Sequence, residues 1–123
     1  GISITELMTQ EQIDRVVERT RKGGAEIVSL LKTGSAFYAP GASVVKMIEA
    51  ILHDKRRILP CTAYLEGEYG WEGIFFGVPV MLGIHGIEKV IELKLTDEEK
   101  TALDASAQEV KKTCDEIDAI IKG

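Results

Sequence analysis

The sequence predicts an α+β domain in which two helices, three antiparallel strands and a final helix follow one another, with the helices packed on the small sheet. Near both ends of the chain, apolar residues recur at three- and four-residue spacing, which is typical of amphipathic helices. The stretch 58–93 between them is rich in apolar residues and interrupted by glycines, which is typical of short strands. The length of 123 residues suits one domain, so we expect residues 1–123 to form a single domain.

The first helix is expected over residues 9–32. Thr9 and Gln12 have the spacing of a capping box at its start, and Gly34 suits its end. Gly23 and Gly24 fall in the middle of this helix, where each glycine costs about 1 kcal/mol relative to alanine. Two adjacent glycines at that place predict a bend, or another backbone lying very close.

The second helix is expected over residues 37–53, with its apolar face centred on Met47 and Ile48. Pro40 lies near its start, and the first turn is where a helix tolerates proline best.

Three strands are expected next, over residues 58–65, 74–82 and 87–93. Short links between them predict an antiparallel meander, with a hairpin turn at residues 83–86. Pro79 cannot donate a hydrogen bond to a neighbouring strand. We therefore expect its strand to lie at an edge of the sheet or to carry a bulge there.

The last helix is expected to begin at Thr96, which forms a second capping-box pattern with Glu99. One narrow apolar seam follows it, consisting of Leu103, Ala107, Val110, Cys114, Ile117 and Ile121. This pattern favours a surface helix packed on the sheet, and a coiled-coil partner is the alternative.

Charge and cysteine content narrow the classes of function. The net charge of −5, from 15 basic and 20 acidic residues, argues against general nucleic-acid binding. No apolar stretch is long enough for a membrane-spanning helix, so we expect no membrane partner. Cys61 and Cys114 are interpreted as two packed thiols of a reduced, cytoplasmic protein. Without a Cys-x-x-Cys pattern or paired histidines, no metal site is predicted.

No complete active site is visible in these residues. His53 is expected at a helix end and His85 in a turn, and neither belongs to a triad pattern. The short basic clusters at residues 19–22 and 55–57 are interpreted as solvated surface rather than anion sites. The unusual segment is 34–43, where small residues alternate with aromatic ones at a helix start. Either an anionic group at the helix N-terminus or tight helix packing would explain it. Because the chain begins at Gly1 and pattern starts at once, we expect a piece of a longer polypeptide.

Collinear segments along essentially the whole chain carry a family resemblance. They are Glu18–Val28, Gly34–Ser43, Tyr64–Gly70, Gly77–Val80 and Gly86–Lys89. In this combination the chain resembles the C-terminal domain of the lactate/malate dehydrogenase family. Within that family it is most similar to the bacterial malate dehydrogenases that are built like lactate dehydrogenase.

The resemblance implies an NAD-dependent oxidoreductase that interconverts malate and oxaloacetate and forms a homo-oligomer, either a dimer or a tetramer. It also implies that a Rossmann domain, the proton-relay histidine and the substrate-binding arginines lie upstream of Gly1. No catalytic residue is therefore expected in this chain. Ser35 and Ala36 are expected to line the substrate pocket, and Pro40 is expected near the nicotinamide ring. The small side chain of Ala36 would leave room for a four-carbon diacid.

Two other interpretations remain open. One is a lactate-type 2-hydroxyacid dehydrogenase domain, because the position of Ala36 distinguishes the two branches of the family. The other is a non-catalytic assembly domain, because the seam of the last helix and the acidic charge suit a protein interface.

Overall fold

The computed structural model of the chain describes residues 1–122 and contains two compact units. The first unit is formed by residues 1–44, and the second begins at Val45. Among the described residues, no helix is both long and apolar enough to cross a membrane. The expected α+β order of helices, three-stranded sheet and final helix is confirmed.

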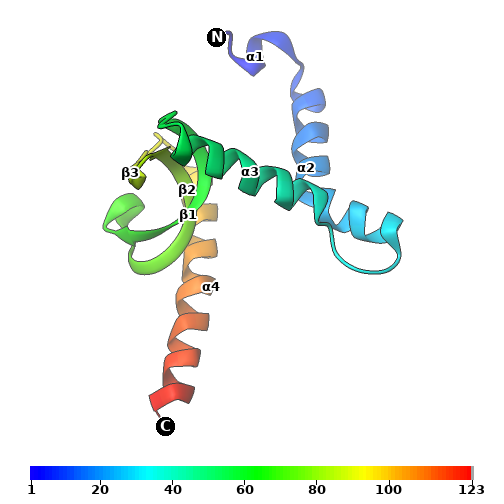
Figure 1. Ribbon diagram of the computed structural model, residues 1–123. Coiled ribbons are helices and arrows are strands. Elements are labelled where there is room, and N and C mark those ends of the chain that lie inside the picture. The colour runs from blue at the N-terminus through cyan, green and yellow to red at the C-terminus, as the bar shows by residue number, and fades with distance from the viewer. Residues whose placement is uncertain (123) are drawn as a thin grey trace. The chain divides into compact units, whose positions relative to one another are not determined.

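The first unit consists of α1 (Ile4–Leu7), α2 (Gln10–Leu31) and the beginning of α3 (Tyr38–Leu52). The short helix α1 was not expected from the sequence. The capping box at the start of α2 is confirmed, because Thr9 and Gln12 hydrogen-bond reciprocally through side chain and backbone. Figure 1 shows α2 bending partway along its length, as the adjacent glycines predict. None of residues 1–44 is buried, so the apolar residues of this unit stay uncovered.

The second unit contains the sheet. Its strands are β1 (Arg57–Glu66), β2 (Glu72–Gly83) and β3 (Gly86–Val90), in the order β1-β2-β3, and neighbouring strands are antiparallel. The predicted meander and the hairpin turn after Gly83 are therefore confirmed.

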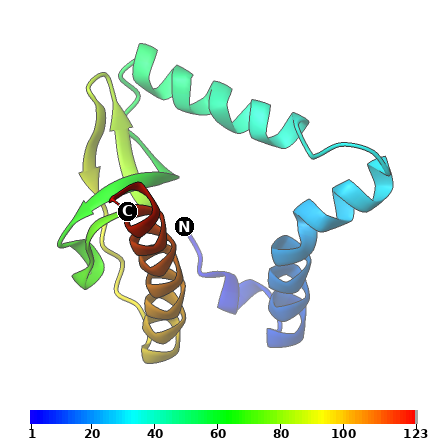
Figure 2. The ribbon, with the colours of Figure 1, turned by 90° about the horizontal axis from the view of Figure 1, so that it is seen from below.

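The core of the second unit lies on one face of this sheet. The final helix, α4 (Asp97–Lys122), contacts β2, and Figure 2 shows it running beside the sheet. Ala107 of α4 is completely buried, and Met47 from α3 packs against the same cluster. The buried side chains of the strands alternate along β1 and β2 and comprise Cys61, Ala63, Leu65, Ile74, Val78, Val80 and Leu82.

The seam of α4 is covered over only part of its length. The helix begins with the predicted capping box, in which Thr96 and Glu99 exchange hydrogen bonds of 2.8 and 3.2 Å. Leu103 and Val110 pack against the core cluster. Ile121, by contrast, keeps 76% of its surface exposed, and Figure 1 shows the last part of α4 extending past the sheet. Packing on the sheet therefore accounts for the first half of the seam alone.

Pro79 lies in the central strand, so the expectation of an edge strand is wrong. It stands opposite Pro60 on one side, and its carbonyl oxygen accepts a hydrogen bond from Ile91 N at 2.8 Å on the other side. In an antiparallel strand, the N–H and C=O groups of one residue point to the same neighbour. Pro79 therefore lacks the donor that the Ile91 carbonyl oxygen would otherwise meet. The nearest shift in register lies at Met81/Leu82, not at Pro79.

Tyr69 supplies this missing donor. Its hydroxyl donates to the Ile91 carbonyl oxygen at 2.8 Å and accepts from Leu93 N at 3.0 Å. Tyr69 itself is buried and has a left-handed backbone with φ of 56°. The sheet can therefore tolerate proline in its central strand because a side chain from the β1–β2 turn completes the hydrogen bonding.

We expect Tyr69→Phe to lower the free energy of unfolding of the second unit by about 1–3 kcal/mol, because it leaves the partly buried Ile91 carbonyl oxygen and the Leu93 N–H without their partner. Urea denaturation followed by Trp71 fluorescence measures this loss, since Trp71 lies in the same turn. Tyr64→Phe is the matched control, because the Tyr64 side chain is half exposed on the same sheet. Equal effects of the two substitutions would contradict the role of the Tyr69 hydroxyl.

Candidate functional site

The predicted site residues lie in the link between α2 and α3 and in the first turn of α3. After α2 ends at Leu31, Lys32 takes φ of 60° and Gly34 takes φ of 85°. These left-handed residues reverse the chain, and glycine accommodates that conformation without steric cost. Ser35 and Ala36 therefore lie in the link itself.

Pro40 lies in the first turn of α3, as expected. There its missing N–H removes no helical hydrogen bond. Gly41 N donates to the Phe37 carbonyl oxygen at 2.9 Å and closes this turn. Ser35, Ala36 and Pro40 thus fall within one short segment of the first unit.

Exposure distinguishes the members of this segment. Ala36 is half-buried, whereas Ser35 and Pro40 are exposed. Phe37 and Tyr38 are 59% and 81% exposed, and their rings lie 4.7 Å apart between centroids. Tight helix packing, one of the two explanations of the segment, is therefore not seen among the described residues. The segment offers small and apolar groups, and it contains no histidine, carboxylate or lysine side chain.

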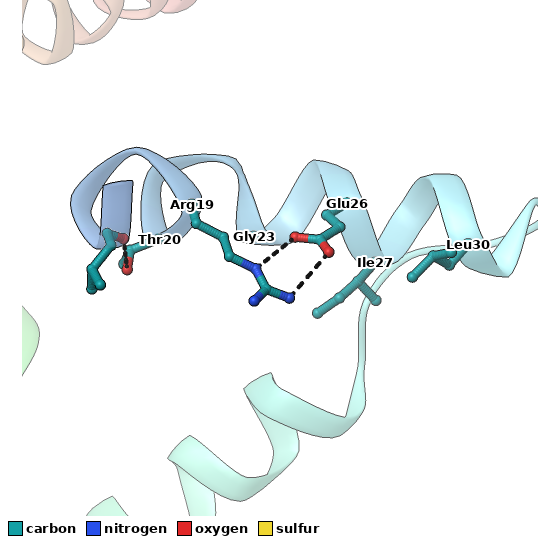
Figure 3. A pocket seen from close by; sticks show the side chains of 7 residues that line it. Arg19, Thr20, Gly23, Glu26, Ile27 and Leu30 are labelled. Carbon is teal, nitrogen blue, oxygen red and sulfur yellow. Dashed lines mark hydrogen bonds and ion pairs between the residues drawn. The ribbon is translucent and has the colours of Figure 1, made fainter. Parts of the chain in front are cut away.

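A shallow hollow lies along α2, upstream of the same link (Figure 3). Its walls are mainly apolar, formed by Val16, Thr20, Gly23, Ile27 and Leu30. Arg19 and Glu26 form an ion pair of 3.4 Å across it, and Figure 3 shows the pair on either side of Gly23. The hollow carries no unpaired catalytic group.

Neighbouring carboxylates pair with some of the side chains in each basic cluster. Lys22 pairs with Glu18 at 2.6 Å, and Lys55 pairs with Glu49 at 3.0 Å. The Lys55 ammonium lowers the pKa of Glu49, first through its hydrogen bond and then through its charge. These contacts agree with the interpretation of solvated surface.

The thiols and histidines form no reactive constellation. Cys61 is buried, and burial raises the pKa of its thiol. Cys114 is exposed, so the expectation of two packed thiols is wrong for this residue, which lies beyond the covered part of the α4 seam. His53 follows the end of α3 and His85 lies in the hairpin turn, both exposed. Within residues 1–122, no group of three or more acidic, histidine or cysteine side chains could hold a metal ion.

Three carboxylates hold the turn between β1 and β2, an arrangement that sequence reasoning missed. Glu68 Oε2 accepts from Glu66 N at 2.7 Å, and Glu92 Oε2 accepts from Tyr69 N at 2.7 Å. The backbone N–H of Glu66, and after it that of Glu68 itself, lowers the pKa of Glu68. These acceptors compensate for a turn that contains several left-handed residues.

The third carboxylate, Asp104 of α4, accepts from Trp71 Nε1 at 2.8 Å and from the Lys100 ammonium. Lys100, and after it Trp71, lowers the pKa of Asp104 through these hydrogen bonds. Apart from the i, i+4 spacing of Lys100 and Asp104, no sequence signal reveals this contact, because Trp71 and Asp104 lie far apart in the chain. The turn between β1 and β2 is thereby tied to α4.

A second cluster joins the end of α3 to the hairpin. Arg56 Nε lies 3.3 Å from Glu88 Oε2 and 3.6 Å from Asp54 Oδ1. Asp54 also accepts from Ile84 N at 3.1 Å. A Cβ atom at Gly83 would lie 2.8 Å from Glu88 Cδ and 2.9 Å from Asp54 Oδ1, which is closer than such atoms approach. A side chain at position 83 would therefore have to displace the carboxylate groups of Glu88 and Asp54.

Comparison with known proteins shows the family of the chain. The family model described as "lactate/malate dehydrogenase, alpha/beta C-terminal domain" matches residues 2–121. A malate dehydrogenase from Geobacillus kaustophilus is 64% identical over 111 residues, which cover 90% of this chain and 36% of that protein. One from Roseiflexus sp. is 59% identical over 110 residues, covering 89% of this chain and 36% of that protein.

Solved structures agree. Malate dehydrogenase from Salinibacter ruber matches with a TM-score of 0.91 and 48% identity, over 99% of this chain and 40% of that one. Lactate dehydrogenase from Eimeria maxima, determined with NADH and oxamate, matches with a TM-score of 0.88 and 40% identity, over 97% of this chain and 37% of that one. The chain therefore spans a little over a third of the length of these relatives.

We expect Asp104→Asn to destabilise the second unit near neutral pH, and to have progressively less effect as the pH falls below about 4. The folded state lowers the pKa of Asp104, so its stabilisation is present above the unfolded-state pKa and is lost as the pH falls through the folded-state pKa. Urea midpoints of both proteins between pH 7 and pH 3, read by Trp71 fluorescence, measure this. Asp115→Asn, which removes an exposed α4 carboxylate paired with Lys111, is the control. A pH-independent difference for Asp104→Asn would contradict the assignment.

We expect Gly83→Ala to lower the free energy of unfolding of the second unit by about 1–3 kcal/mol, because the added methyl group has to displace Glu88 or Asp54. Gly77→Ala, in the same strand, has open space at its Cβ position and is the control. Thermal denaturation of both variants measures the difference. Equal melting temperatures would show that the Glu88 side chain moves aside freely.

Proposed function

Because the chain belongs to the lactate/malate dehydrogenase family as its α/β C-terminal domain, we propose that it is the substrate-side part of an NAD-dependent malate dehydrogenase. Its high identity to malate dehydrogenases over about 90% of its length is the observation that carries this proposal. The substrate pair is malate and oxaloacetate. A Rossmann domain preceding Gly1 completes the protein, and residues 1–123 then act as one C-terminal domain.

In this proposal, bound NAD accepts a hydride from C2 of malate. Ser35 and Ala36 line the substrate pocket, and Pro40 lies near the nicotinamide. The half-buried Ala36 leaves space for the second carboxylate of a four-carbon acid. Pro40 is apolar and has no N–H, so it excludes water and offers no competing donor beside the reacting ring. The proton-relay histidine and the substrate-binding arginines belong to the preceding part of the polypeptide.

The chain also contributes to the surface of a cytoplasmic homo-oligomer, either a dimer or a tetramer, in this proposal. The uncovered second half of the α4 seam and the exposed apolar side chains of α2 support it, because such faces are typical of interfaces. A partner helix along the α4 seam and an assembly role for the isolated chain remain compatible with the same observations.

We expect the 123-residue chain alone to show no malate-dependent reduction of NAD, because its site segment contains no histidine or carboxylate to take the hydroxyl proton. The same chain joined to a Rossmann domain of the family is expected to turn over. Absorbance of NADH at increasing malate concentration measures both. Robust turnover by the 123-residue chain would contradict the division of roles.

We expect Ala36→Thr in the joined polypeptide to shift the ratio of kcat/KM for oxaloacetate over pyruvate towards pyruvate by about tenfold or more, since a larger side chain removes space for the diacid. Ala42→Thr, at an exposed position of α3, is the matched control. An unchanged ratio would remove Ala36 from the specificity argument, and a wild-type preference for pyruvate would favour the lactate branch.

A further inference from the structure

The bend of α2 lies at Gly23 and Gly24, the residues with the lowest helix propensity in this helix. Gly23 and Gly24 add no side-chain contacts, and a Cβ atom at either position would meet nothing within 4 Å. No other backbone therefore approaches these Cβ positions within that distance. Of the two explanations for adjacent glycines, the structure therefore supports the bend. Figure 3 shows the two parts of α2 meeting beside Gly23.

One ion pair spans this bend. Arg19 lies before it and Glu26 after it, and the guanidinium makes two contacts of 3.4 and 3.5 Å with the carboxylate. The spacing of seven residues corresponds to about 10.5 Å along a straight helix. The Lys22–Glu18 pair, in contrast, joins adjacent turns on one side of the bend. Arg19 and Glu26 are thus placed to hold two segments together.

The Arg19–Glu26 ion pair is weak enough to break and re-form. The Arg19 side chain is 79% exposed and that of Glu26 is 45% exposed, and exposed ion pairs are individually weak. A weak contact across a flexible point biases an equilibrium between helix angles without abolishing it.

We propose that Gly23 and Gly24 form a hinge in α2 and that the Arg19–Glu26 pair latches it. By holding the angle of the hinge, Arg19 and Glu26 act as positioning residues for the segment that contains Ser35 and Ala36. The part of α2 after the hinge ends directly at that segment, so its angle sets where the segment lies. The role in catalysis rests on the proposed function, whereas the hinge itself rests only on the geometry of α2.

The hinge is tested in the 123-residue chain by the distance between two spin labels, one at Glu11 and one at Ser29, with Cys114 replaced by serine. Buried Cys61 is retained. We expect Glu26→Gln to broaden and lengthen the distance distribution, because the latch is lost. Glu18→Gln, which breaks only the local pair with Lys22, is expected to leave the distribution unchanged. The exchanged pair Arg19→Glu/Glu26→Arg is expected to restore it.

The positioning role is tested in the joined polypeptide. We expect Glu26→Gln to raise KM for oxaloacetate roughly two- to fivefold with a smaller change in kcat, the range that corresponds to loss of an exposed ion pair. The exchanged pair is expected to recover KM. An unchanged label distance in Glu26→Gln, or an equal change in Glu18→Gln, would overturn the hinge. A changed distance with unchanged KM would overturn the positioning role, and absence of malate turnover in the unmutated polypeptide would refute the proposed function alone.

Discussion

The second unit depends on one backbone donor that its central strand cannot provide. Pro79 has no N–H to give to the segment after β3, and the hydroxyl of Tyr69 takes that place at the Ile91 carbonyl oxygen. Because a side chain replaces the backbone donor here, β3 ends at Val90 although the apolar pattern continues beyond it. It also explains the left-handed turn after β1, because this turn brings the Tyr69 hydroxyl to the Ile91 carbonyl oxygen. The carboxylates around the turn then hold it in that conformation.

Local signals in the sequence predicted local structure well. Both capping boxes, the bend at the paired glycines and the meander follow from residues that are neighbours in the chain. Contacts between distant segments were not predictable in this way. The bond from Trp71 to Asp104 joins a turn to a helix, and Pro79 appeared to mark an edge because Tyr69 was not recognised as its complement. The short α1 has too few residues for a periodic pattern.

The candidate site shows the same division between local and distant information. The family resemblance pointed to Ser35, Ala36 and Pro40; the structure has the first two in the link between α2 and α3 and the third in the first turn of α3, within one short and mostly exposed segment. It offers small and apolar groups and contains no histidine or carboxylate side chain. In the proposed function such a segment acts through its position, which is what the proposed hinge in α2 controls.

Trp71 is the only tryptophan of the chain, and its indole is bonded to α4 inside the second unit. Residues 1–44 bury no side chain and contain no tryptophan. Indole emission therefore reports on the second unit and is silent on the first, whereas far-ultraviolet circular dichroism records helices in both. A mismatch between these two signals during heating would reveal that the long bent helix melts before the sheet does.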